Sequence, residues 1–210
     1  RIANAARRVG RDPSEIKLIA VSKTHPASIV REAITAGVNV FGENKVQEAE
    51  SKIVEISRES AEWHLIGHLQ SNKARKAVQI FDVIQSLDSL ELGLRLERIC
   101  AEEHRDALSV FVQVDLGGEA TKSGIAEADL PELVSFLKTC KFLKFNGLMI
   151  LPPYFEDAEG TRPFFKRLRV LRDEILSGGE LSMGMSHDFE VAIEEGATII
   201  RVGTAIFGNR

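Results

Sequence analysis

A single lysine at the end of an apolar segment is the residue in this chain best suited to covalent chemistry. Segment 17–23 (KLIAVSK) has the pattern of a buried strand, and that pattern stops at the amine of Lys23. Burial disfavours the charged form of a lysine, so an amine in such a place can supply the neutral nucleophile that attacks an aldehyde and forms a Schiff base. From this segment alone, a lysine that points to water is the simpler interpretation, and the rest of the chain must decide.

Two strand-like segments near the end of the chain finish in residues that suit a phosphate group. One contains Gly184 and Ser186, and the other is followed by Gly203 and Thr204. The hydroxyl groups can donate hydrogen bonds, and glycine lets a backbone N–H approach a ligand with no Cβ in the way. Ordinary turn and helix-start chemistry is the alternative interpretation of the same residues.

Composition limits the classes of protein to consider. The chain has 210 residues, 44% hydrophobic and 28% charged, which predicts one globular domain over residues 1–210. A net charge of -4 argues against a broadly basic surface for nucleic acid or membrane. Cys100 and Cys140 lie too far apart in sequence to suggest a disulfide framework or a metal knuckle, so we expect a reducing cytoplasm. The chain begins at Arg1 within a helix-like segment, which is compatible with further residues before it.

Hydrophobic periodicity predicts eight strands that alternate with helices. The strand candidates are 17–23, 38–43, 62–67, 81–87, 109–116, 143–151, 181–186 and 197–203. The helix candidates are 26–36, 44–58, 72–79, 88–105, 127–140, 161–176 and 188–195, with 2–9 as an extra leading helix. Strict alternation with near-continuous apolar strands indicates a parallel sheet covered by helices. We therefore predict a (β/α)8 TIM barrel, because the Gly-rich signature of the rival open doubly wound sheet does not follow the first strand.

The barrel converts scattered polar residues into one predicted site. In such barrels the carboxyl ends of the strands meet on one face, and a phosphate commonly lies by the loops after the last two strands. The residues at or near these ends are Lys23, Asn44, His68, Met149, Ser186, Arg201, Gly203 and Thr204. A reactive amine beside a phosphate cradle is what pyridoxal 5′-phosphate requires.

The chain resembles the pyridoxal phosphate homeostasis protein family over nearly its whole length. The matching segments, in order, are AVSKT (20–24), FGEN (41–44) with Gln47 and Glu48, WHLIGHLQSNK (63–73), KSG (122–124), GLM (147–149), LSMGMS (181–186) with Asp188, and RVGTAIFG (201–208). The resemblance implies a single-domain barrel of the alanine racemase N-terminal-domain type, with Lys23 as the internal aldimine lysine. It also implies that Ser186, Gly203 and Thr204 surround the phosphate and that Arg201 lies near the pyridine nitrogen.

Arg201 bears on whether the site holds a cofactor or turns over a substrate. A guanidinium is effectively always protonated, so an arginine that faces the ring nitrogen donates to it and leaves it unprotonated. The ring is then a poor electron sink, which disfavours aminotransferase-like chemistry. An ion pair between Arg201 and a carboxylate at the barrel mouth is the alternative.

The remaining polar residues have weaker assignments. A racemase needs a second acid or base opposite the lysine, and Tyr154 is the one tyrosine of the chain, although packing under the turn at Pro152 and Pro153 is its simpler role. Asn44 is a helix cap or a cofactor contact, and Met149 is core filler or a contact to the ring face. His64 and His68 resemble a metal pair, but no third ligand is evident, so we predict no metal site.

The sequence thus favours a cytoplasmic, monomeric protein that binds pyridoxal phosphate as carrier or buffer, with little or no catalytic turnover and transient contacts to cofactor-requiring apoenzymes. An amino-acid racemase that uses the same lysine is the alternative, and a metal-dependent barrel hydrolase is a third.

Overall fold

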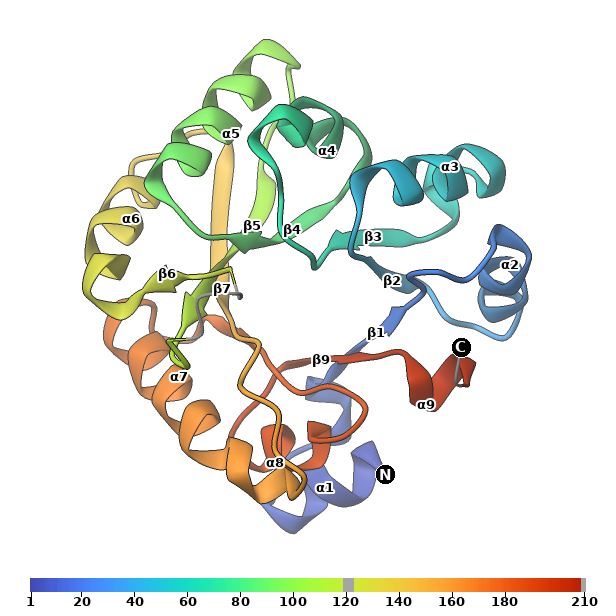
Figure 1. The fold of residues 1–210 in the computed structure, drawn as a ribbon, viewed down its shortest axis with the longest axis vertical. Coiled ribbons are helices and arrows are strands. Elements are labelled where there is room, and N and C mark those ends of the chain that lie inside the picture. Colours follow the sequence, from blue (N-terminus) through green and yellow to red (C-terminus); the bar gives the residue numbers. More distant parts are fainter. Residues whose placement is uncertain (119–122, 209–210) are drawn as a thin grey trace.

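Eight parallel strands close into a barrel in the computed structural model, which describes residues 1–118 and 123–208 (Figure 1). In ring order they are β1 (Lys17–Val21), β2 (Val40–Glu43), β3 (Glu62–Leu65), β4 (Val83–Leu87), β5 (Leu108–Asp115), β7 (Leu143–Met149), β8 (Glu180–Ser182) and β9 (Ile199–Val202). The pairs β4–β5 and β1–β9 close the ring. The predicted (β/α)8 barrel is therefore confirmed. Lys122, which belongs to the segment 122–124, lies outside the described residues.

Strand side chains alternate between the barrel interior and the helices outside, because successive residues of a strand point to opposite faces. One apolar cluster occupies part of the interior and consists of Ile19, Val40, Val83, Phe111, Met149 and Ile199. The neighbouring positions, such as Ala20, Phe41 and Ile200, belong to the larger cluster that packs the strands against the helices. The near-continuous apolar pattern of the strands follows from this burial on both faces.

Helices surround the strands on the outside of the barrel (Figure 1). They are α1 (Ile2–Arg8), α2 (Ala27–Thr35), α3 (Val46–Ile56), α4 (Ala74–Ile80), α5 (Leu90–Glu102), α6 (Leu130–Leu137), α7 (Arg162–Ile175), α8 (Phe189–Glu194) and α9 (Thr204–Phe207). Short 3-10 turns occupy Pro13–Glu15, Arg58–Ser60, Ser71–Lys73, Glu127–Asp129 and Ala158–Thr161. No helix in the described ranges is long and apolar enough to cross a bilayer.

The predicted extra N-terminal helix is present as α1 and lies against α8 (Figure 1). Ala5 and Ala6 are fully buried. Arg8 forms ion pairs with Glu190 and Glu194 at 3.1 and 2.8 Å. Small residues on the buried face and charged residues on the other thus fix α1 to the barrel wall.

Two elements were not predicted. The two-residue strand β6 (Ile125–Ala126) pairs with the end of β5, and α9 follows β9 immediately. Both are too short to show a hydrophobic period, because strand alternation needs about 4–8 residues and a helical period needs about 11 or more.

Several strands end earlier than predicted, and these differences bear on the site. β1 ends at Val21, so Lys23 lies in a turn in which the His25 amide donates to the Ser22 carbonyl at 3.1 Å and Thr24 has a φ of 68°. β8 ends at Ser182 because Gly184 has a φ of 94°, which takes the chain out of extended conformation.

Candidate functional site

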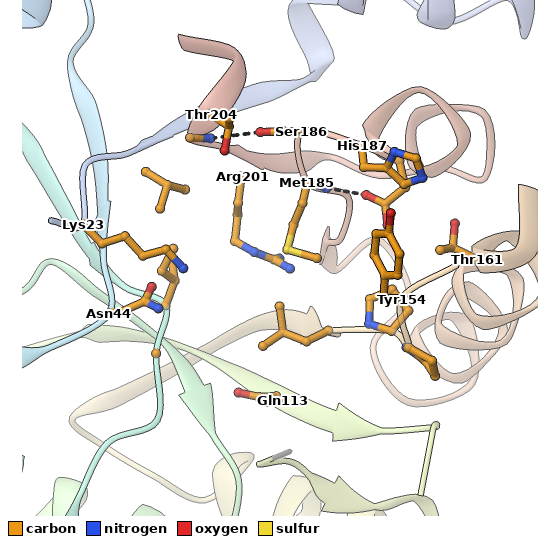
Figure 2. A pocket seen from close by; sticks show the side chains of 18 of the residues that line it. Lys23, Asn44, Gln113, Tyr154, Thr161, Met185, Ser186, His187, Arg201 and Thr204 are labelled. Atoms are coloured by element: carbon orange, nitrogen blue, oxygen red, sulfur yellow. Dashed lines mark hydrogen bonds between the residues drawn. The ribbon is translucent and has the colours of Figure 1, made fainter. Parts of the chain in front are cut away.

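A pocket of about 650 Å³ opens at the carboxyl ends of the strands (Figure 2). Six of the seven predicted cofactor-binding residues line it: Lys23, Asn44, Ser186, Arg201, Gly203 and Thr204. They come from four separate places in the chain, which the closed barrel brings together. Met149, the seventh, is fully buried in the interior cluster and is not among the lining residues.

A charged network behind the pocket holds the turn that carries Lys23. The buried Lys52 amine of α3 donates to the Ser22 carbonyl at 2.7 Å, to Glu43 Oε1 at 2.8 Å and to Glu48 Oε1 at 2.7 Å. Ser22 Oγ donates to Glu43 Oε1 at 2.6 Å, and the Thr24 amide donates to Glu48. Both neighbours of Lys23 in sequence are therefore anchored, which fixes the point from which the Lys23 side chain extends.

Glu43 is the fully buried carboxylate of this network. Burial raises the pKa of Glu43, while its hydrogen bonds from Lys52 and Ser22 oppose that rise. Glu43 Oε2 is buried without a hydrogen-bond partner among the described residues. Glu43 thus depends on the Lys52 ammonium for its charge compensation.

Arg201 enters the pocket from β9 and is only 3% exposed. Its Nη1 donates to Ser182 Oγ at 2.7 Å, and its Nη2 donates to the Ile150 carbonyl at 2.8 Å. Burial lowers its pKa to about 10, with the charge of Asp188 acting in the opposite direction, so the guanidinium remains protonated at neutral pH. The alternative of an ion pair with a carboxylate is wrong for the described residues, since the partners of Arg201 are neutral oxygens.

Ser186, Gly203 and Thr204 form one group of donors at the other side of the pocket. The Gly203 amide donates to Ser186 Oγ at 3.3 Å (Figure 2). Thr204 begins α9, and the first amides of a helix have no acceptor within it. The hydroxyl groups of Ser186 and Thr204 therefore lie close together at this side of the pocket (Figure 2), an arrangement that suits binding of a phosphate.

The loop before these donors is fixed by packing. A Cβ on Gly184 would lie 2.6 Å from the Cβ of Ala192, so this glycine permits close contact with α8 and does not line the pocket. The Met185 amide donates to Asp188 Oδ1 at 2.6 Å, and burial raises the pKa of Asp188. Gly184 therefore acts through the loop, in contrast to the predicted direct approach to a ligand.

Asn44 and Tyr154 lie at different depths. The cap residue of α3 is Lys45, without a side-chain hydrogen bond, so the interpretation of Asn44 as a helix cap is wrong; Asn44 lies beside Lys23 in the pocket (Figure 2). Tyr154 is 77% exposed and its ring lies 5.6 Å from the ring of His187. Packing under the proline turn is therefore wrong for Tyr154, which stands at the rim.

Several lining residues were not predicted, among them His25, Gln113, Thr161 and His187. His25 lies two residues after Lys23 and His187 directly follows Ser186, so position in a strand-end loop was the available signal. His64 and His68 do not converge: His64 contacts Glu62 and Gln85 inside the barrel, whereas His68 contacts Asp88 at 3.0 Å. Within the described ranges, no three His, Cys, Asp or Glu side chains form a metal-binding group.

Comparison with known proteins agrees with this geometry. The family model "Alanine racemase, N-terminal domain" matches residues 1–210. The pyridoxal phosphate homeostasis protein of Aquifex aeolicus is 43% identical over 100% of this chain and 94% of its own length; that of Pseudomonas aeruginosa is 46% identical over 100% and 91%. The structure of PipY from Synechococcus elongatus PCC7942 with PLP bound has a TM-score of 0.86 and 43% identity, covering 99% of this chain and 100% of PipY. The chain therefore belongs to the alanine racemase N-terminal domain family and, within it, to the pyridoxal phosphate homeostasis proteins.

Proposed function

We propose that this chain binds pyridoxal 5′-phosphate in the pocket at the strand ends and serves vitamin B6 homeostasis as a carrier or buffer of that cofactor. One observation carries the proposal: an amine, a buried guanidinium held by a hydroxyl and a backbone carbonyl, and a group of hydroxyl and amide donors share one pocket. The names of the relatives and the PLP-bound PipY structure support it.

Each lining group has a proposed role. Lys23 forms the covalent bond, Ser186, Gly203 and Thr204 bind the phosphate, and Asn44 makes a polar contact beside the amine. Bound pyridoxal phosphate supplies an aldehyde carbon that an amine can attack and a ring that stores negative charge when its nitrogen is protonated. Arg201 can only donate a hydrogen bond to that nitrogen, so it keeps the nitrogen unprotonated. This arrangement favours retention of the cofactor over turnover of an amino acid.

Chemical trapping tests the covalent site. The purified protein, loaded with pyridoxal phosphate, is expected to be yellow and to retain the cofactor after borohydride reduction. Peptide mapping should locate the reduced adduct on Lys23. An adduct on any other lysine would contradict the proposed site.

Transfer kinetics test the carrier role. Loaded protein is mixed with the apo form of an unrelated pyridoxal phosphate enzyme, and recovery of that enzyme's activity is compared with the release of cofactor to a small-molecule trap. Recovery faster than release indicates delivery through transient contact. Recovery at the release rate indicates a buffer, and no recovery with no release would overturn both roles.

A racemase is the second candidate, because Tyr154 lines the same pocket as Lys23. Each positioned acid or base contributes about 10²–10⁴-fold in rate, and an exposed tyrosine at the rim is poorly positioned. We expect negligible racemisation of alanine and serine. Robust racemisation that is lost in both Lys23→Ala and Tyr154→Phe would put the enzyme first.

We further propose that residues 1–210 act as one domain, as a monomer, in the cytoplasm. Sedimentation of the loaded protein should give the mass of one chain, 23.2 kDa. A stable dimer would contradict the monomer.

A further inference from the structure

A line of polar side chains crosses the barrel interior and begins at Arg201. Arg201 Nη1 donates to Ser182 Oγ at 2.7 Å, and Ser182 Oγ donates to Gln85 Oε1 at 2.6 Å. Gln85 Nε2 lies 2.8 Å from His64 Nδ1. The line ends with His64 Nε2 at 2.7 Å from Glu62 Oε1.

The line connects opposite ends of the barrel. Arg201 lies at the pocket, whereas Glu62 is the first residue of β3 and pairs at 3.3 Å with Lys17, the first residue of β1. The three middle residues, Ser182, Gln85 and His64, are at most 1% exposed. Solvent therefore reaches the line at Glu62 and not along its length.

The direction of every hydrogen bond in the line follows from its two ends. Arginine can only donate, so Ser182 Oγ accepts from it, and the Ser182 hydroxyl donates its own hydrogen to Gln85 Oε1. The Gln85 amide then presents its NH₂ group to His64, whose Nδ1 must be an acceptor. The single ring proton of His64 consequently lies on Nε2 and is donated to the Glu62 carboxylate.

We propose that Ser182, Gln85 and His64 are positioning residues that fix the donor orientation of Arg201 through this directed line of hydrogen bonds. The proposal rests on the proposed function only in that Arg201 faces the cofactor ring. Reversal of the Gln85 amide would place its carbonyl oxygen against the bare Nδ1 of His64, acceptor against acceptor, and such unsatisfied groups are strongly disfavoured in an interior. The orientation of Arg201 is thus determined by groups that do not line the pocket.

The ring nitrogens of His64 give a readout that needs no cofactor. Long-range proton–nitrogen NMR of the cofactor-free protein at neutral pH is expected to show His64 with a protonated Nε2 and a bare Nδ1. In Gln85→Glu, the new carboxylate offers His64 only an acceptor, so both nitrogens should carry protons. The matched amide-to-acid change Gln79→Glu, on the exposed surface of α4, should leave the His64 signals unchanged. A protonated Nδ1 in the wild type, or unchanged His64 signals in Gln85→Glu, would refute the proposed line of hydrogen bonds.

A second experiment reads the effect on the pocket. Ser182→Ala removes the acceptor of Arg201, and we expect a shifted absorption maximum of the bound cofactor and about tenfold faster release. The control is Ser86→Ala, which deletes an equally buried strand hydroxyl that donates instead to the Gly67 carbonyl at 2.7 Å. Equal spectra and equal release in the two variants would refute the positioning role. Failure of the wild type to bind any cofactor would refute the proposed function. The His64 signals would still show whether the line of hydrogen bonds has the proposed direction.

Discussion

Among the described residues, the lysine and the arginine that line the pocket, Lys23 and Arg201, are held in different ways. Lys23 lies half-buried in a turn beyond β1, and its neighbours are anchored by a network of ions in which Lys52 bridges Glu43 and Glu48. Arg201 lies within β9, almost fully buried, and its partners are the hydroxyl of Ser182 and a backbone carbonyl.

This difference matches what each group must do. A nucleophilic amine needs a fixed origin and a side chain that can change protonation, and the ion pairs of Lys52 fix the turn from which the Lys23 side chain extends. A guanidinium whose hydrogen bonds go to neutral oxygens keeps its charge inside the pocket, where a ligand acceptor can use it. The ion pairs of Lys52 therefore position Lys23, and the neutral hydrogen-bond acceptors of Arg201 preserve its charge.

The largest effect is expected at the amine itself. Lys23→Ala should abolish covalent loading, because it deletes the proposed nucleophile, while the free energy of unfolding changes by only about 0.5 kcal/mol, as for other substitutions of incompletely buried residues. Absorption spectroscopy, borohydride labelling and urea unfolding check this. Lys45→Ala, an exposed lysine beside Asn44, serves as the control and should load normally. Borohydride labelling that persists in Lys23→Ala would show that another lysine carries the cofactor and that Lys23 has no special role.

The ionic support should be the next most sensitive part. Lys52→Met leaves the buried Glu43 carboxylate without its cation, which typically costs about 3–5 kcal/mol. Urea unfolding measures this loss, and the rate of covalent loading at Lys23 should also fall. Lys76→Met removes a lysine from an exposed pair with Glu50 and should cost less than about 1 kcal/mol. Similar losses in the two variants would show that the network does not position the turn.

The phosphate donors should control retention without changing the covalent bond. Hydrogen bonds to a charged group contribute roughly 1.5–3 kcal/mol each, so Ser186→Ala with Thr204→Val should weaken cofactor binding at least about tenfold and leave its absorption maximum in place. Ser135→Ala with Thr139→Val makes the same changes on and beside α6, where both hydroxyls donate to backbone carbonyls. If dialysis strips both double variants equally fast, these hydroxyls are not phosphate ligands.

The smallest effect is expected at Glu62, the outer end of the line of hydrogen bonds that begins at Arg201. The hydrogen bond with His64 lowers the pKa of Glu62 from 4.5 to about 2. Between these two values the unfolded chain binds more protons at this residue than the folded chain, so Glu62 stabilises the fold above pH 4.5 and loses that contribution as the pH falls towards 2. Because Glu62 is partly exposed, the contribution is expected to be small.

Urea unfolding at pH 5 and pH 3 measures this dependence. The wild type should lose more stability over that interval than Glu62→Gln, whereas Glu132→Gln, an exposed change on α6, should follow the wild type. An equal loss of unfolding free energy between pH 5 and pH 3 in wild type and Glu62→Gln would show that Glu62 does not belong to the line of hydrogen bonds that reaches Arg201.

Much of the site was accessible from local pattern. The apolar strands, the alternation with helices and the position of Lys23 after the first strand all follow from short-range periodicity, and together they predicted the barrel and six lining residues. Boundaries were less accurate at Lys23 and Ser186, because positive backbone angles at Thr24 and Gly184 end the strands early. The hydrogen-bonded line also left a signal in the sequence, because His64 and Gln85 interrupt apolar strands at positions that face inward.

What the sequence by itself determined is which segments become strands and helices, and which reactive residues follow the strands, since hydrophobic period and residue chemistry are properties of neighbouring residues. Only the tertiary structure decided which of those residues meet. Lys52 supports the Lys23 turn from a helix 30 residues further along the chain, and Ser182 contacts Gln85 across 97 residues. The first contact depends on the pairing of β1 with β2, and the second depends on closure of the ring through the β1–β9 and β4–β5 pairs. No local period records which strands will face each other across the closed barrel.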